Sequence, residues 1–180
     1  IAATQNENNL KVMIDYVINR HYPNIKNSKK PALDLLKTLI NVQVDLVIDW
    51  MRVGFIHGVM NTDNMSISGE TIDYGPCAFM DDYNPQTVFS SIDQKGRYAF
   101  LNQPKIIKWN LARFAECIIT LIDIDKDKAI EIATETINTF EGIYEKKWLN
   151  MMRDKLGLFG EDPNDQALIM DLLNWMNNNK

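Results

Sequence analysis

The sequence has 180 residues, enough for one domain with a substantial core, and we expect a single domain over residues 1–180. Hydrophobic residues make up 46% and charged residues 24%, and the absence of a long uninterrupted apolar run argues against a membrane span. The formal net charge of −5 disfavours nonspecific binding to nucleic acid or to anionic membranes.

The first part of the chain is predicted to form two helices. Apolar residues recur at helical spacing from Leu10 to Ile18, after the possible caps Asn8 and Asn9, and Pro23 closes this segment. A second, longer helix is expected to begin near Pro31 and to run toward residues 50–53. Its apolar stripe predicts a buried scaffold helix.

The pattern changes between Gly54 and about Pro104, where apolar runs shorten and polar residues cluster around several glycines. Residues 65–67 and 71–73 flank Ser68-Gly69-Glu70, which predicts a short β-hairpin with Gly69 in its turn. We expect the chemistry of the protein to lie in this region.

Helical periodicity returns after Pro104 and predicts one helix that continues to Leu121. A long helix is then expected from Asp127 to a stop at Gly157, and a final helix after residues 162–163. The fold class is therefore mainly α with a small β-hairpin. The predicted core stripe of the long helix is Ile130, Ala133, Ile137, Phe140, Tyr144, Trp148 and Met151 or Met152, and the final helix is expected to include Leu168 and Leu172.

The most informative stretch is HGVMNTDNMSISGETIDYGP, residues 57–76. Magnesium prefers oxygen ligands, and it commonly takes one or two protein side chains together with water and substrate phosphates. Asn64 and Asp73 offer such a pair on either side of the predicted hairpin, whose fold-back would bring them together. Asp63 adds a second carboxylate immediately before Asn64.

A similar arrangement is found in protein kinases, where a catalytic loop ends in a metal-binding Asn and is followed by Asp-Phe-Gly. Asn64 lies seven residues after His57, as in the kinase loop, and Asp73 begins Asp-Tyr-Gly. The position of the usual kinase base is Val59, so the base of an ordinary kinase is absent. Asp63 is the nearest replacement.

The segment RVGFIHGVMNTDNMSISGETIDYGPCAFMDDY, followed by GRYAF, QP and WNLARFAE, resembles the selenoprotein O (YdiU) family. The resemblance covers about residues 52–116 and extends less strongly through DYVINRHYP near the start. It implies a protein-kinase-like fold that transfers AMP from ATP to hydroxyl groups of Ser, Thr or Tyr in proteins.

By position, the resemblance implies that Asp63 is the proton acceptor, that Asn64 and Asp73 bind Mg²⁺ or Mn²⁺, and that Asp73 also faces the ATP. The glycine-containing loop and phosphate-binding lysine of the family have no match here. The chain is therefore expected to be the larger, C-terminal lobe without its small N-terminal lobe, a fragment of a larger protein that is inactive alone. The partners implied are ATP and protein substrates, in the cytoplasm of a bacterium.

Several residues also have simpler structural interpretations. His57 is expected to form structural hydrogen bonds, and Arg97 could contact phosphate, a protein substrate or a structural ion pair. The acidic run at residues 123–127 resembles the start of a calcium loop but is better explained as a helix start. Cys77 and Cys117 indicate neither a zinc site nor a disulfide.

Two other functions remain open at this point. Val59 at the usual base position is compatible with a noncatalytic pseudokinase scaffold. The same three residues, Asp63, Asn64 and Asp73, could also serve a metal-dependent phosphohydrolase.

Overall fold

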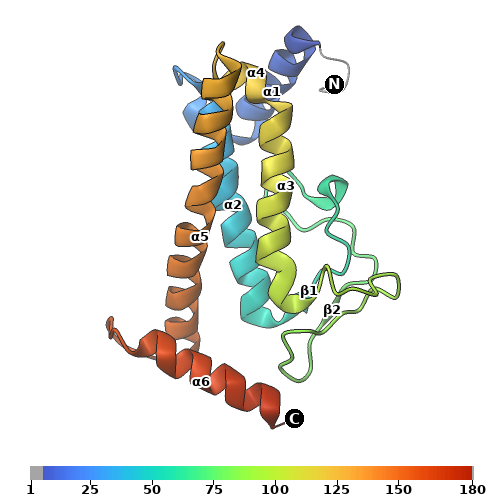
Figure 1. Ribbon diagram of the computed structural model, residues 1–180, viewed down its shortest axis with the longest axis vertical. Helices are drawn as coiled ribbons and strands as arrows, with labels where there is room; N and C mark the ends of the chain where they lie inside the picture. Colours follow the sequence, from blue (N-terminus) through green and yellow to red (C-terminus); the bar gives the residue numbers. More distant parts are fainter. Residues whose placement is uncertain (1–5, 180) are drawn as a thin grey trace.

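The computed structural model describes residues 6–179 and is mainly helical (Figure 1). Three short 3-10 turns cover Pro23–Ile25, Thr62–Asn64 and Phe100–Asn102. The two short strands are β1 (Phe55–Ile56) and β2 (Ala78–Phe79). The helices are α1 (Glu7–His21), α2 (Pro31–Val53), α3 (Gln103–Cys117), α4 (Ile119–Ile122), α5 (Lys126–Leu156) and α6 (Asp165–Asn178).

Helix α2 is the centre of the fold, because it packs against both α3 and α5 (Figure 1). Its apolar residues are spaced so that more than one face is buried, which suits a helix between two neighbours. The predicted scaffold helix is thus confirmed. The most deeply buried side chains of α2 are those of Leu35, Leu36, Ile40, Val44 and Val47.

The helix ends show capping by polar side chains and glycines. The side chain of Asn6 accepts a hydrogen bond from the backbone N–H of Asn9, so Asn6 caps α1 and the proposed caps Asn8 and Asn9 are wrong. Gly157 ends α5 in the left-handed conformation, with φ of 67°, which confirms the predicted stop.

The single helix predicted after Pro104 is interrupted at Ile118. Helix α3 ends at Cys117, and the short helix α4 continues the chain in a new direction. Neither glycine nor proline marks this break. It allows Ile118 and Ile122 to be buried against the other helices, a tertiary contact that outweighs the local preference for a continuous helix.

The buried stripe of α5 differs in part from the prediction. The side chain of Ile130 is 45% exposed, and the buried position in this turn is Ala129. The stripe then passes through Ala133, Ile137 and Phe140, as predicted. In α6, Leu168 is exposed and Ile169 is buried instead, because α6 meets the end of α5 along a narrow contact.

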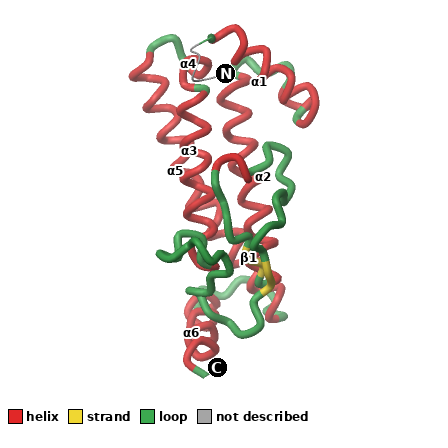
Figure 2. The backbone as a smooth tube through the Cα atoms, turned by 90° about the vertical axis from the view of Figure 1, so that its right-hand side faces the viewer, coloured by secondary structure: helices red, strands yellow, loops and turns green. Residues whose placement is uncertain are grey.

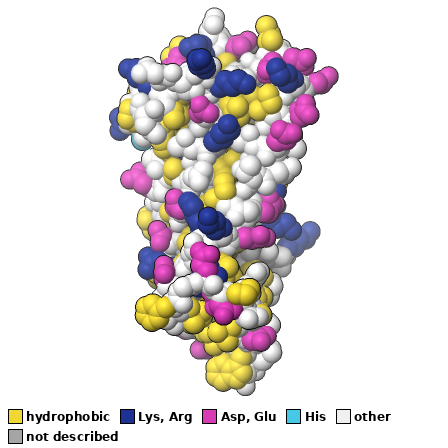
Figure 3. All heavy atoms as spheres, turned by 90° about the vertical axis from the view of Figure 1, so that its left-hand side faces the viewer, with side chains coloured by type: hydrophobic (Ala, Val, Ile, Leu, Met, Phe, Trp, Pro, Cys, Tyr) yellow, Lys and Arg dark blue, Asp and Glu magenta, His cyan; other side chains and the backbone are white. Residues whose placement is uncertain are grey.

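Apolar side chains gather on the surface at the end of the molecule that carries α6 (Figure 3). Phe159 is fully exposed just before α6, and Trp175 is largely exposed within it. Along the helices above, acidic and basic side chains are mixed. Helix α6 therefore contributes little to the core.

Helix α6 is held to α5 by an ion pair. The Nε atom of Arg153 donates to Oδ2 of Asp165 at 2.6 Å, and the two side chains are only 12% and 11% exposed. The same carboxylate oxygen accepts from the backbone N–H of Asp162 at 3.1 Å. These two donors, the backbone N–H first, lower the pKa of Asp165 below its ordinary value.

This pair predicts a pH dependence of stability. Since the pKa of Asp165 is lower in the folded than in the unfolded state, its stabilising contribution is complete above about pH 4 and is lost as the pH falls below that. We expect the Tm of the protein, measured by circular dichroism, to fall more steeply on acidification than the Tm of Asp165→Asn. Parallel Tm curves for the two proteins would contradict this assignment.

The predicted β-hairpin is reduced to a single antiparallel bridge between Met65 and Thr71. Gly69 occupies its turn with φ of 79°, as expected. The two-stranded antiparallel element lies elsewhere, where Phe55 of β1 pairs with Phe79 of β2. A short β element is therefore confirmed, but its strands close a long loop instead of a tight turn. Within residues 6–179, no helix is long and apolar enough to span a membrane.

Candidate catalytic loop

The predicted site residues all lie in the long loop between α2 and α3, residues 54–102. Figure 2 shows this loop spread over one face of the helices. Asp63 and Asn64 belong to the 3-10 turn Thr62–Asn64, and Asp73 follows the Met65–Thr71 bridge. Asn64 directly precedes this bridge and Asp73 follows it by two residues, so both flank the Gly69 turn in the chain.

The loop is held by side chains from α2 and α3 and by Tyr22, which follows α1. Because most of the loop has no regular secondary structure, its polar groups, mainly backbone carbonyls, need partners from elsewhere. These hydrogen bonds fix the path of the chain on both sides of the predicted site. The donors and acceptors are Tyr22 Oη to Ile67 O (2.5 Å), Gln43 Nε2 to Ser66 O (2.7 Å), Trp50 Nε1 to Thr71 Oγ1 (2.9 Å), Asn110 Nδ2 to Met60 O (3.0 Å) and Gln103 Nε2 to Phe55 O (3.0 Å).

Gln103 makes two of the contacts that position His57. Its side chain is completely buried, donates to the carbonyl of Phe55 and accepts from the backbone N–H of His57 at 3.0 Å. One buried amide thus fixes the backbone at the start of the loop. Such a group is costly to remove, because both of its partners lose their hydrogen bonds without reaching water.

Replacing Gln103 with leucine should destabilise the protein by about 2–4 kcal/mol, since the His57 N–H and the Phe55 carbonyl would be left buried without partners. The measurement is the free energy of unfolding from urea denaturation. Gln94→Leu serves as the matched control, because Gln94 is exposed in the same loop. A similar, small change in both variants would show that the Gln103 contacts do not stabilise the loop.

His57 connects the two halves of the predicted site. Its ring is almost completely buried, and Nε2 lies 2.8 Å from the carbonyl oxygen of Ile72, the residue before Asp73. A carbonyl only accepts, so Nε2 carries a proton. Nδ1 accepts the backbone N–H of Val59 at 3.4 Å, and the ring centroid lies 5.5 Å from that of Trp50. These contacts support the structural role expected for His57.

Asn64 is oriented by a hydrogen bond from its own amide. The Nδ2 atom donates to the carbonyl of Val59 at 3.0 Å, so the side-chain oxygen is the atom left to bind a cation. Asp63, the preceding residue, is exposed on the turn. An exposed carboxylate beside a fixed amide can accept a proton from an approaching hydroxyl group.

Asp73 has an unusual backbone conformation. With φ of 56°, it is the one non-glycine residue with positive φ between residues 6 and 179. Its carbonyl accepts the N–H of Gly75 at 2.8 Å, which makes a tight turn. Asp is among the few residues that tolerate this region, and strained conformations of this kind concentrate at functional sites.

Gly58 is a site residue that the sequence did not indicate. It has φ of 86°, and a Cβ atom at this position would lie 2.9 Å from the carbonyl oxygen of Pro76. The segment after His57 therefore passes close to the segment after Asp73, which only glycine permits. The sequence does show a glycine directly after His57. It does not show that Pro76, 18 positions further along the chain, lies against this glycine.

The chemistry of Asn64 and Asp73 determines which metal ions suit the predicted site. Within the described part of the chain, no three His, Cys, Asp or Glu residues lie close enough together to hold a metal ion. One amide oxygen and one carboxylate suit Mg²⁺, which keeps several waters and takes further ligands from phosphates. The pair does not suit zinc, which prefers His and Cys ligands.

Arg97 does not form the ion pair that was one of its alternatives. Between residues 6 and 179, its guanidinium has no acidic partner and instead lies 4.9 Å from the centroid of the Trp109 ring. The nearby Asp93 accepts hydrogen bonds from the backbone N–H groups of Arg97 and Tyr98.

The acidic run at residues 123–127 is a helix start. Asp125 caps α5 by accepting from the N–H groups of Asp127 and Lys128, and Asp123 pairs with Lys128 at 2.9 Å. The hydrogen bond from Lys128 lowers the pKa of Asp123. Both cysteines are free thiols, as expected.

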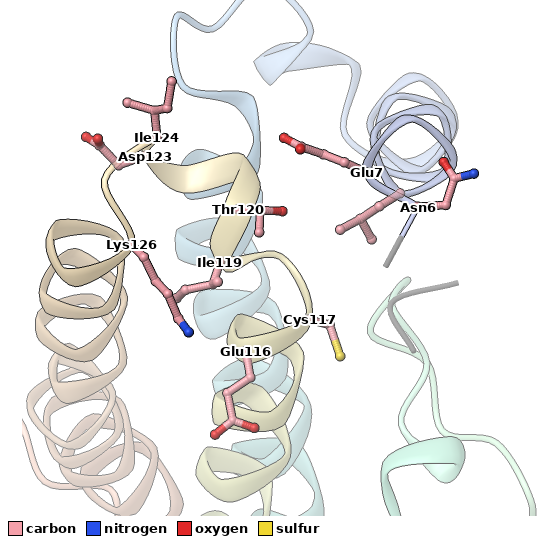
Figure 4. A pocket seen from close by; sticks show the side chains of 10 residues that line it. Asn6, Glu7, Glu116, Cys117, Ile119, Thr120, Asp123, Ile124 and Lys126 are labelled. Carbon is pink, nitrogen blue, oxygen red and sulfur yellow. The ribbon is translucent and has the colours of Figure 1, made fainter. Parts of the chain in front are cut away.

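Two of the pockets bear on the predicted site: one lies beside it, and the other lies at a distance, next to α1 and α4. A pocket of about 270 Å³ lies beside the 3-10 turn and is lined by residues that include Thr62, Phe114 and Arg113. A second pocket, of about 510 Å³, lies between α1, α4 and the ends of α3 and α5 (Figure 4). Asp63, Asn64 and Asp73 line neither of these two pockets; Asp63 and Asp73 are exposed, and Asn64 is half-buried.

Comparison with known proteins gives a consistent result. The family model described as "Protein adenylyltransferase SelO" matches residues 1–180. A protein nucleotidyltransferase YdiU from Pelagibacter ubique is 70% identical over 180 residues, all of this chain and 37% of the relative. Proteins of the same name from Nitrosococcus oceani and Rhizobium meliloti are 56% and 53% identical over 176 and 179 residues, 98% and 99% of this chain and 36% of each relative. The chain thus spans about a third of the length of these relatives.

Proposed function

The chain belongs to the family of the protein adenylyltransferase SelO, and on this basis we propose that the full-length protein transfers AMP from ATP to hydroxyl groups of proteins. The acceptors are Ser, Thr or Tyr side chains. The reaction needs ATP, Mg²⁺ or Mn²⁺ and a protein substrate, and we place it in the cytoplasm, where ATP is supplied.

The step is a displacement at the α-phosphorus. The acceptor hydroxyl oxygen forms a bond to this phosphorus, the bond to the bridging oxygen of the β-phosphate breaks, and pyrophosphate leaves. Asp63 takes the hydroxyl proton. Asn64 and Asp73 would hold the metal ion, whose charge would stabilise the phosphate oxygens.

The observation that carries this proposal is that one buried histidine connects the loop segments of Asn64 and Asp73. Nδ1 of His57 accepts the backbone N–H of Val59, and the carbonyl of Val59 accepts the side-chain amide of Asn64. The other ring nitrogen of His57 holds Ile72, next to Asp73. A site in which separate loop segments are held by one rigid group is preorganised for electrostatic catalysis.

We further propose that this helical region corresponds to the larger lobe of a protein-kinase-like fold. The seven-residue spacing from His57 to Asn64 and the Asp-Tyr-Gly at Asp73 support this assignment. Both residues lie in a loop between helices, as the kinase catalytic loop and its metal-binding partner do.

A second candidate function, a noncatalytic scaffold, is favoured by Val59. Val59 occupies the position of the usual kinase base. Its backbone N–H and carbonyl both form structural hydrogen bonds, and its side chain cannot accept a proton. A hydrolase that uses the same residues is the third alternative.

The test compares the products of ATP turnover by the full-length protein with a mixture of protein substrates. The proposed reaction releases one pyrophosphate for each AMP that becomes attached to protein, as measured by pyrophosphate assay and intact-mass spectrometry. A scaffold releases none. A phosphohydrolase releases nucleotide or phosphate without modified protein, and either outcome would refute AMP transfer.

A further inference from the structure

A cluster of cationic and aromatic side chains lies beside the candidate catalytic loop. The guanidinium groups of Arg97 and Arg113 lie 4.9 Å and 5.3 Å from the centroid of the Trp109 ring, which is 43% exposed. We call Arg97, Trp109 and Arg113 the arginine platform. Its charge is opposite to the net charge of the chain, which is −5.

Two observations connect the surroundings of the arginine platform to the segment that carries Asp63. Tyr98, the neighbour of Arg97, donates its hydroxyl to Oδ1 of Asn61 at 2.7 Å, two residues before Asp63. On the other side, Arg113 and Thr62 line the same pocket. The platform therefore borders the 3-10 turn from two elements, the end of the long loop and α3.

One guanidinium of the arginine platform is free to bind an anion. Arg113 is paired with Glu116 at 2.5 Å, but the guanidinium of Arg97 has no hydrogen-bonding or acidic partner among the residues that the structure describes. Two positive groups near one ring repel each other, and only one of them is neutralised. An additional carboxylate would relieve this repulsion and accept hydrogen bonds from the free guanidinium.

Asp93, the acidic residue nearest to Arg97 in the sequence, does not pair with the Arg97 guanidinium. Both carboxylate oxygens of Asp93 accept backbone N–H groups, those of Arg97 and Tyr98, at 2.8 Å and 2.7 Å. This arrangement fixes the loop and leaves the side chain of Arg97 to lie over Trp109. The indole in turn holds the guanidinium by a cation–π contact, which limits its loss of freedom on binding.

We propose that the arginine platform binds acidic residues of the protein substrate that lie close to the acceptor hydroxyl. This inference rests on the proposed function, because a substrate hydroxyl must approach Asp63 and its flanking residues then lie over the neighbouring surface. Arg97 selects negatively charged segments, and Trp109 holds Arg97 in place. The platform would thus determine which hydroxyl groups are modified.

The test is peptide binding by the full-length protein without nucleotide, measured by fluorescence anisotropy at low salt. The labelled probe is a short peptide with a central serine flanked by glutamates, and its partner has glutamines in their place. We expect the glutamate peptide to bind about tenfold more tightly, and this preference to shrink as salt is added. Equal affinity of the two peptides would overturn the proposal.

Variants identify the residues responsible. Arg97→Gln should abolish the preference for the glutamate peptide, and Arg97→Lys, which keeps the charge, should retain part of it. Arg20→Gln removes the same charge from α1 and should leave the preference intact. A preference that survives in Arg97→Gln, or one lost equally in the folded Arg20→Gln, would contradict the assignment.

Competition distinguishes the platform from a nucleotide site. We expect ATP with Mg²⁺ to leave peptide binding unchanged and Arg97→Gln to leave ATP affinity unchanged. Displacement of the peptide by ATP, together with weaker ATP binding in the variant, would place Arg97 at the nucleotide and overturn the proposal. If no AMP transfer occurs but the Arg97-dependent preference remains, the proposed function fails and the docking surface stands.

Discussion

Replacing Asp73 with asparagine should lower AMP transfer by the full-length protein by roughly 10³-fold or more, because in the proposed mechanism the change removes the charged ligand that would hold the metal near the phosphates. Asparagine is the sharper choice than alanine. The backbone of Asp73 has φ of 56°, and Asn tolerates that conformation whereas Ala is strained in it. Loss of activity in Asp73→Asn therefore reports the charge and not the turn.

The control for Asp73 is Asp82→Asn, which removes a carboxylate from an exposed position of the same loop. It should retain wild-type transfer. Circular dichroism and the Tm of Asp73→Asn should match those of the wild type, because the side chain is exposed. Normal transfer with an unchanged Mg²⁺ requirement in Asp73→Asn would refute its role as a ligand.

Replacing Asp63 with asparagine should lower the rate of AMP transfer by about 10²–10⁴-fold, since the acceptor hydroxyl would lose its proton acceptor. The affinity for ATP should change little, because in the proposed mechanism Asp63 acts on the hydroxyl and not on the nucleotide. The measurements are single-turnover transfer rates and calorimetric titration with ATP and Mg²⁺. Asp63→Ala should behave in the same way.

Asp81→Asn is the matched control for Asp63, with an exposed carboxylate in the same loop. Its rate and its ATP affinity should both equal those of the wild type. If Asp63→Asn loses ATP affinity and rate to the same extent, then Asp63 is a metal ligand and the proton acceptor must be another group.

The helices could be predicted because their apolar residues recur at a regular spacing and because proline and glycine mark several ends. Gly157 is an example of a stop that the sequence indicates and the structure confirms. The break at Ile118 could not be predicted, since it depends on which apolar side chains find space against α2 and α5. The shift from Ile130 to Ala129 in the buried stripe of α5 has the same cause.

The candidate site residues were selected from local spacing, but the side chains that hold their loop could not be predicted in this way. Gln43 and Asn110 bind carbonyls of the loop that lie 23 and 50 positions away in the sequence. In the sequence, each appears as a polar residue on the apolar face of a helix. This pattern indicates that the side chain is buried, but it does not identify the carbonyl that it binds. The strained backbone of Asp73 likewise arises from the tertiary path of the loop.

The most direct test of AMP transfer uses ATP labelled separately at the α- and γ-phosphate, with the wild-type full-length protein and Asp73→Asn in parallel. The proposed function predicts that protein acquires the α label and never the γ label, and that Asp73→Asn acquires neither. Incorporation of the γ label would identify a kinase instead. Equal α labelling by the wild type and Asp73→Asn would show that the site lies elsewhere.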